Sequence, residues 1–191
     1  HTYLTDLAAP LAIGATGLIA LDWFNGNKSI LADSRLSGMI LGMTIHTKPE
    51  HIYRTLLEAT AFGCREILEA YTAVGVPIRE IVACGGIANK NPFMMQMYAD
   101  VLGKPIRVSR NTQAAALGAA IMAAAAAEGT RLEEAVDRMA DRESKLYLPD
   151  PARQAAYEKL YREYARLHDY FGRGENPVME HLTNLKIQIS Q

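Results

Sequence analysis

The most informative stretch of this chain is Glu80-Ile81-Val82-Ala83-Cys84-Gly85-Gly86-Ile87-Ala88-Asn89-Lys90-Asn91-Pro92. Its apolar beginning is typical of a short buried strand, and two adjacent glycines end that strand. After a polar turn, Asn91 before Pro92 predicts a helix with an Asn N-cap and a first-turn proline. A strand, a glycine turn and a helix bring backbone N–H groups close to a ligand, which predicts a binding turn for a nucleotide or another polyanion. An ordinary turn in which glycine only relieves crowding explains the same residues.

Length and composition limit the class of protein. A chain of 191 residues with 49% hydrophobic content predicts one domain with a proper core, or one domain and a small appendage. The net charge of −1, with both signs interspersed, indicates neither a nucleic-acid nor a membrane partner. Cys64 and Cys84 lie among apolar residues, which predicts buried free thiols and a cytoplasmic protein. The first residue is His1 rather than Met, so we expect a fragment boundary there.

Strand-like and helical patterns alternate along the chain. Strand-like segments occupy residues 17–24 and 37–43, the second being a strand or a loop, and a long helix follows a capping box at Thr47 and Glu50. The helix from Pro92 precedes a strand at 106–109, an alanine-rich helix at 113–128 and a short helix with a capping box at Thr130 and Glu133. Asp150-Pro151 predicts the start of the last helix. Strand, helix and strand with short loops predict an α/β fold whose sheet is at least partly parallel.

Several side chains have structural interpretations. Trp23 and Phe24 are predicted to be packing anchors. A solvated helix face is predicted for Glu58, Arg65, Glu66 and Glu69, with a paired Glu58 as the alternative because its neighbours are less polar. The last twenty residues, 172–191, are predicted to be a tail that docks through Leu185, Ile187 and Ile189. A tyrosine stripe is predicted at the edge of the core with its hydroxyls in water, at Tyr157, Tyr161 and Tyr164.

Three stretches of the chain resemble the C-terminal domain of the FGGY carbohydrate kinase family. The first is 17–28, in which Asp22-Trp23 and Asn25-Gly26-Asn27-Lys28 are typical of the ribulokinase branch. The second, 38–58, is similar to an FGGY signature but carries Thr55 and Leu56 where smaller residues are usual. The third runs from Gly85-Gly86 through Asn91 and continues at Gln96, Asp100, Val101 and Leu102, and Ala116–Ala120 is also family-like. The resemblance covers about residues 10–170.

The resemblance implies an actin-like ATPase domain, with a ribonuclease-H-like mixed sheet flanked by helices and lacking its leading strands. On this basis residues 1–171 are part of a C-terminal kinase domain and 172–191 are a C-terminal tail. Whole enzymes of the family have two such domains, bind ATP and sugar between them and use Mg²⁺. The implied reaction transfers the ATP γ-phosphate to L-ribulose and gives L-ribulose 5-phosphate, a step of arabinose catabolism.

The family also implies where the chemistry lies. Its catalytic base is an aspartate of the first domain, so Asp22, Asp33 and Asp100 are not assigned as bases, and the chain alone is expected to be inactive. The glycine turn packs on adenine and ribose, while an earlier loop holds the phosphates. Gly85, Gly86 and Ile87 would therefore offer a flat surface to the base, and Asn89 or Asn91 would hydrogen-bond it. No catalytic or metal-binding residue is assigned within the chain.

Three alternatives stay open at this point. The first is another FGGY kinase, such as a xylulokinase or a ribitol or ribulose kinase, and the second is a non-catalytic actin-like nucleotide-binding domain. The third is an α/β domain whose Gly-Gly turn is only structural. The expected partners are ATP or ADP and a pentulose that binds through the N-terminal domain. An exposed sheet edge would also promote a homodimer.

Overall fold

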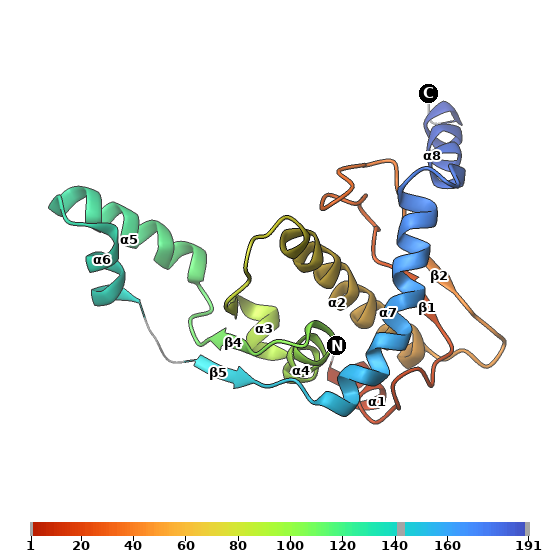
Figure 1. Ribbon diagram of the computed structural model, residues 1–191, viewed down its shortest axis with the longest axis horizontal. Coiled ribbons are helices and arrows are strands. Elements are labelled where there is room, and N and C mark those ends of the chain that lie inside the picture. The colour runs from red at the N-terminus through yellow and green to blue at the C-terminus, as the bar shows by residue number, and fades with distance from the viewer. Residues whose placement is uncertain (1, 141–143, 190–191) are drawn as a thin grey trace. The chain divides into compact units, whose positions relative to one another are not determined.

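The computed structural model describes residues 2–140 and 144–189, which form two compact units (Figure 1). The first unit contains the residues up to Arg79, Asp100–Gly103 and the residues from Pro149. The second contains Glu80–Ala99 and the residues from Lys104 to Leu148. Within the described ranges, no helix is both long enough and apolar enough to cross a lipid bilayer.

The first unit packs helices around a two-stranded antiparallel sheet. Strands β1 (Ile19–Leu21) and β2 (Met39–Leu41) pair with Ala20 opposite Ile40. The long helix α2 (Pro49–Ala73) contacts α1 (Thr2–Ala8), β1 and α7 (Pro151–Gly172), and α8 (Val178–Ile189) follows. The predicted strand at 17–24 and both long helices are thereby confirmed. Buried apolar side chains from α2, β1 and α7 form the core, among them Leu21, Phe62 and Tyr157.

The two long helices begin with different kinds of cap. Asp150 Oδ1 accepts the N–H groups of Ala152 and Arg153, each at 2.9 Å, which confirms the predicted start of α7. The capping box predicted at Thr47 and Glu50 is wrong, because Lys48 is the N-cap of α2. Thr47 Oγ1 instead accepts the N–H of Thr44 at 2.9 Å, within the preceding turn.

A buried ion pair joins α1, α2 and α7. Arg54 Nε lies 2.8 Å from Glu58 Oε1, and both side chains are 3% exposed. Arg54 Nη1 also donates to the carbonyl of Ala8 at 3.0 Å, and Nη2 lies 3.4 Å from the Tyr157 hydroxyl. The prediction of a solvated face is therefore wrong for Glu58, which is buried and paired, and burial raises the pKa of its carboxyl group.

The tyrosines of α7 do not leave their hydroxyls in water. Tyr164 is fully buried and donates to Asp22 Oδ1 at 3.2 Å. The Tyr161 hydroxyl lies 2.9 Å from Glu66 Oε1 and 2.8 Å from Glu69 Oε2. The prediction of wet hydroxyls is therefore wrong for Tyr161 and Tyr164, because acidic side chains of α2 and of the residue after β1 face this stripe. It is also wrong for Tyr157, which is fully buried with its hydroxyl 3.4 Å from Arg54 Nη2.

The predicted aromatic anchors behave differently. Trp23 is buried and meets the His168 ring edge-on, with 5.3 Å between ring centroids, so its anchor role is confirmed. Phe24 is 64% exposed, so the same prediction is wrong for that residue. The Phe24 ring lies against the backbone of Gly38, where an added Cβ atom would be 2.5 Å from the ring.

The C-terminal residues form α8 and attach to the first unit through one face. Met179 is buried, and Arg35 pairs with Glu180 at 3.0 Å while its carbonyl accepts the Thr183 hydroxyl at 3.0 Å. The prediction that the tail docks through Leu185, Ile187 and Ile189 is wrong, since these three side chains are exposed.

The second unit is built on a three-stranded mixed sheet. Strand β3 (Ile81–Ala83) pairs in parallel with β4 (Ile106–Ser109), as the spacing predicts, and β4 pairs antiparallel with β5 (Ser144–Tyr147). Strand β5 was not expected from the sequence. Val82 shares a face of the sheet with its partner Arg107 on β4 and with Leu146 on β5, and all three are exposed. Val82 is 59% exposed, so the prediction of a buried strand is wrong here.

Among the described residues of the second unit, four helices lie wholly or mainly within it. They are α3 (Gly86–Lys90), α4 (Pro92–Leu102), α5 (Ala114–Glu128) and α6 (Leu132–Met139). The alanine-rich α5 packs on α6 through Ile121, Ala125 and Ala135 (Figure 1). Helix α6 starts after Arg131, so the capping box predicted at Thr130 and Glu133 is wrong.

Candidate functional site

The Gly-Gly turn follows β3 directly and continues into a short helix. Gly85 has φ +93° and ψ 178°, a conformation that strains any residue with a side chain, and it is the N-cap of α3. The polar turn predicted after the glycines is thus the single helical turn of α3, followed by α4 from Pro92. Strand, glycine turn and helix are present as the sequence predicts.

The side chains of Asn89 and Asn91 form different hydrogen bonds. Asn89 Nδ2 donates to the carbonyl oxygens of Gly85 at 3.0 Å and Ser109 at 2.9 Å, which fastens the turn to the end of β4. Asn91 Oδ1 accepts the N–H of Met94 at 3.0 Å, so the predicted N-cap of α4 is confirmed. Asn89 therefore holds the turn in place, whereas Asn91 starts the next helix.

The outer surface of the turn is open and partly apolar. A Cβ atom built on Gly86 would meet no other atom within 4 Å, so packing against the described residues does not require glycine at this position. The neighbouring Ile87 is 70% exposed. Cys84 is also exposed, which corrects the prediction of a buried thiol, although both cysteines are free as expected. This surface leaves room for a flat group to approach the backbone.

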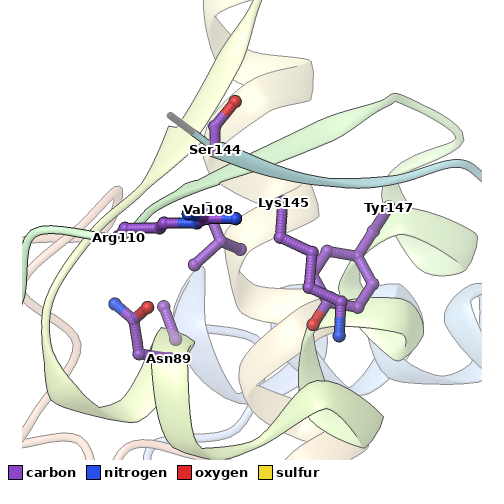
Figure 2. A pocket seen from close by; sticks show the side chains of 7 residues that line it. Asn89, Val108, Arg110, Ser144, Lys145 and Tyr147 are labelled. Atoms are coloured by element: carbon purple, nitrogen blue, oxygen red, sulfur yellow. The ribbon is translucent and has the colours of Figure 1, made fainter. Parts of the chain in front are cut away.

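A cavity of about 420 Å³ lies beside the turn (Figure 2). Asn89 belongs to both the turn and the cavity, while Val108 is buried in its wall. Lys145 Nζ lies 4.9 Å from the centroid of the Tyr147 ring. The described lining residues come from α3, the end of β4 and β5, and are Ala88, Asn89, Val108, Arg110, Ser144, Lys145 and Tyr147.

The sequence did not single out most of this cavity. Arg110 follows β4, and Ser144, Lys145 and Tyr147 belong to β5, the strand that was not expected. Ser144-Lys145-Leu146-Tyr147 does not alternate between polar and apolar residues, so no period-two pattern indicated a strand here.

The three aspartates that were left without a catalytic assignment all have protein partners. Asp22 accepts the Tyr164 hydroxyl, and burial raises the pKa of its carboxyl group. The Asp33 carboxylate receives Arg35 Nη2 at 2.7 Å, and this bond lowers its pKa. Asp100 is fully buried, accepts the N–H of Asp150 at 2.9 Å and pairs with Arg153 at 2.8 Å. Across residues 2–140 and 144–189, no cluster of three or more His, Cys, Asp or Glu side chains could hold a metal ion.

Comparisons with known proteins support the same family. The profile of the "FGGY family of carbohydrate kinases, C-terminal domain" matches residues 3–127. A ribulokinase from Halalkalibacterium halodurans is 50% identical over 97% of this chain, which spans 34% of that relative's length. The crystal structure of a xylulose kinase from Rhodospirillum rubrum is 31% identical with a TM-score of 0.72, over 88% of this chain and 33% of that one.

A third similar protein is a glycerol kinase from Plasmodium falciparum, whose crystal structure was determined with ADP. It is 25% identical with a TM-score of 0.68, over 86% of this chain and 33% of that one. The sequence profile and the shared actin-like α/β fold lead to one conclusion: the chain belongs to the FGGY family of carbohydrate kinases and corresponds to its C-terminal domain.

Proposed function

We propose that this chain is the nucleotide-binding part of an ATP-dependent ribulokinase, which phosphorylates L-ribulose to L-ribulose 5-phosphate. The observation that carries the proposal is the 50% identity to a curated ribulokinase along almost the whole chain. Because the chain spans about a third of that relative, the activity is proposed for a protein of the relative's length. The chain alone supplies nucleotide contacts and no catalytic base.

The nucleotide contacts follow from the shape of the Gly-Gly turn. We infer that adenine and ribose rest on Gly85, Gly86 and Ile87, where the surface is open and partly apolar. The two hydrogen bonds of Asn89 occupy its Nδ2, so its Oδ1 is the atom that would accept a hydrogen bond from the adenine amino group. Asn91 contributes indirectly, since it caps the helix that follows.

ATP would bring Mg²⁺ with it. Mg²⁺ is usually held by one or two carboxylates together with substrate phosphates rather than by a protein cage. When bound, the ion would neutralise charge on the transferring phosphoryl group. The residues of this chain would bind and orient the nucleotide.

The proposed setting is the cytoplasm, with ATP or ADP and a pentulose as partners. Cys64 and Cys84 are both free, which suits a reducing compartment. We do not propose Asp22, Asp33 or Asp100 as the proton acceptor for the sugar hydroxyl, because each is engaged with protein groups.

The exposed thiol of Cys84 offers a direct test of the nucleotide position. It lies next to Gly85, so bound ATP should slow its reaction with a maleimide, measured by mass spectrometry in a Cys64→Ser variant. Cys64 is removed because it is the second free thiol, although burial raises its pKa and slows its reaction. An unchanged rate of Cys84 modification at saturating ATP would contradict this placement.

The choice of sugar is tested with a protein of the length of the curated relatives. Its phosphorylation rates are compared for L-ribulose, D-ribulose, D-xylulose and ribitol. We expect the highest kcat/KM with L-ribulose. A clear preference for D-xylulose would overturn the ribulokinase proposal and favour a xylulokinase.

A further inference from the structure

The end of helix α2 carries an apolar stripe that the first unit covers only in part. Apolar residues at helical spacing form this stripe, namely Ile67, Ala70, Tyr71 and Val74. Tyr71 is exposed, and Val74, the C-cap residue of α2, is 76% exposed. An apolar helix face usually packs against a partner, and the described residues leave part of this one open.

A loop of the same unit faces the stripe and leaves a hollow of about 350 Å³ between them. The loop contributes Lys28, Ser29 and Ile30 to the lining, and α2 contributes the four residues of its stripe. This volume falls within the range of roughly 300–1,000 Å³ that is typical of small-molecule sites. The hollow is therefore large enough for a small ligand.

Local contacts hold the loop in place. The backbone groups of Asn27 and Asp33 form two reciprocal hydrogen bonds of 2.9 Å, and Asn27 Oδ1 accepts the N–H of Leu31 at 3.2 Å. The Leu31 side chain packs on the end of α7, where a Cβ atom added to Gly172 would collide with it. Both walls of the hollow are thus formed before a ligand binds, which lowers the entropic cost of binding.

The lining of the hollow combines two kinds of chemistry. Ile30, the Tyr71 ring and the aliphatic side chains of α2 provide an apolar surface. Lys28 is the one charged residue of the described lining, and Ser29 adds a hydroxyl that can donate a hydrogen bond. Within residues 2–140 and 144–189, no ion pair or hydrogen bond engages the Lys28 ammonium group. A ligand with an apolar body and one negative head group would use both kinds of lining.

We propose that this hollow binds a fatty carboxylate of medium chain length. The carboxylate would pair with Lys28 and accept a hydrogen bond from Ser29, while the hydrocarbon chain would lie along the stripe of α2. The helix rises roughly 10 Å from Ile67 to Val74, so an extended chain covers more of the stripe than a compact ring.

This site goes beyond the proposed nucleotide contacts. Its lining belongs to the first unit and shares no residue with the Gly85–Gly86 turn, which belongs to the second. It does not depend on which sugar the kinase phosphorylates.

The test is a calorimetric titration of the 191-residue chain with octanoate, beside titrations with acetate and with 1-octanol. Acetate keeps only the head group, and 1-octanol keeps the chain without the charge. We expect octanoate to bind at a single site and more tightly than either of them. Hexanoate, which lacks two methylene groups, should bind about tenfold more weakly, because each buried methylene changes the affinity roughly fourfold.

Lys28→Gln tests the contact with the head group. It should weaken octanoate binding about threefold, the size expected for an ion pair near the surface, and leave 1-octanol binding unchanged. Lys159→Gln is the matched control, because Lys159 is an exposed residue of α7 in the same unit and lies outside the lining. An equal loss of affinity in both variants would show a general charge effect and overturn the proposal.

Ala70→Phe tests the contact with the hydrocarbon chain. The added ring would fill the hollow and should remove octanoate binding. Ala73→Phe adds the same ring to the same helix at an exposed position outside the lining, so it should keep the wild-type affinity. Circular dichroism and thermal unfolding establish that both variants are folded. Wild-type affinity in a folded Ala70→Phe variant would contradict a site in this hollow.

The titrations also separate this proposal from the nucleotide proposal. An absence of octanoate binding, or equal affinities for octanoate and 1-octanol, would overturn the fatty-carboxylate site and leave the nucleotide contacts untouched. ATP should not displace octanoate, and displacement would show that the two ligands do not have separate sites. Gly86→Val should bind octanoate as the wild-type chain does, whatever its affinity for ATP.

Discussion

At the scale of single residues, Asp22 shows how burial alters a carboxyl group. It lies after β1, accepts the Tyr164 hydroxyl, and has its pKa raised mainly by burial. Gly63 leaves it the necessary space, since a Cβ atom there would lie 3.2 Å from both Asp22 carboxylate oxygens. Burial, and then the negative charge of Asp22, raises the pKa of Tyr164.

The raised pKa of Asp22 predicts the sign of a pH effect on stability. Above its unfolded-state pKa, near 3.8, the folded chain binds more protons at this site than the unfolded chain. The free energy of unfolding therefore falls as the pH rises from this value toward the folded-state pKa. Asp22→Asn keeps an acceptor for Tyr164 and should remove this contribution. Urea unfolding, followed by the fluorescence of Trp23 at several pH values, measures the difference between the two proteins.

Asp33→Asn is the control, because Asp33 should change the free energy of unfolding with pH in the opposite direction to Asp22. The bond from Arg35 lowers the pKa of Asp33, so its contribution is present above the unfolded-state pKa and is lost as the pH falls. Because Asp33 is on the surface, its effect should be smaller. Parallel pH profiles for the wild-type chain and Asp22→Asn would contradict the account of Asp22.

At the scale of elements, local chemistry was predictable and pairing between distant segments was less so. Asn91 and Asp150 were identified as caps because a side chain that bonds the next turn is a property of adjacent residues. Thr47 fits a capping pattern equally well, yet the chain turns there and the helix begins after Lys48. Strand β5 was missed because it has four residues, and its partner β4 lies more than thirty residues earlier.

Removing the Asn91 cap is expected to destabilise the first turn of α4. Asn91→Ala removes the acceptor of the Met94 N–H and should cost about 1 kcal/mol. Hydrogen exchange of the first turn of α4, measured by mass spectrometry, should accelerate accordingly. Asn91→Asp retains a good N-cap and should exchange at nearly the wild-type rate. Equal acceleration in both variants would show that Asn91 stabilises α4 by other contacts.

At the scale of the whole molecule, motifs in the sequence were enough to identify the family. The residues that line the cavity could not be identified in this way, because the fold brings them together. Gly85, Gly86 and Asn89 lie in one motif and could be selected from sequence alone. Arg110 and Lys145 are 35 residues apart in the sequence and meet only because β5 pairs with β4. Exposure of Val82 was likewise not predictable, because it depends on which elements cover this face of the sheet.

The most direct test of the central claim is a calorimetric titration of this chain with ATP and ADP in the presence of Mg²⁺. The wild-type chain is compared with Gly86→Val and with Gly118→Val, since added Cβ atoms at both glycines meet nothing within 4 Å. We predict binding by the wild-type chain and by Gly118→Val, and a loss of about tenfold or more in a folded Gly86→Val variant. Equal affinity in all three proteins, or no binding by the wild-type chain, would contradict a nucleotide site on the Gly85–Gly86 turn of this chain.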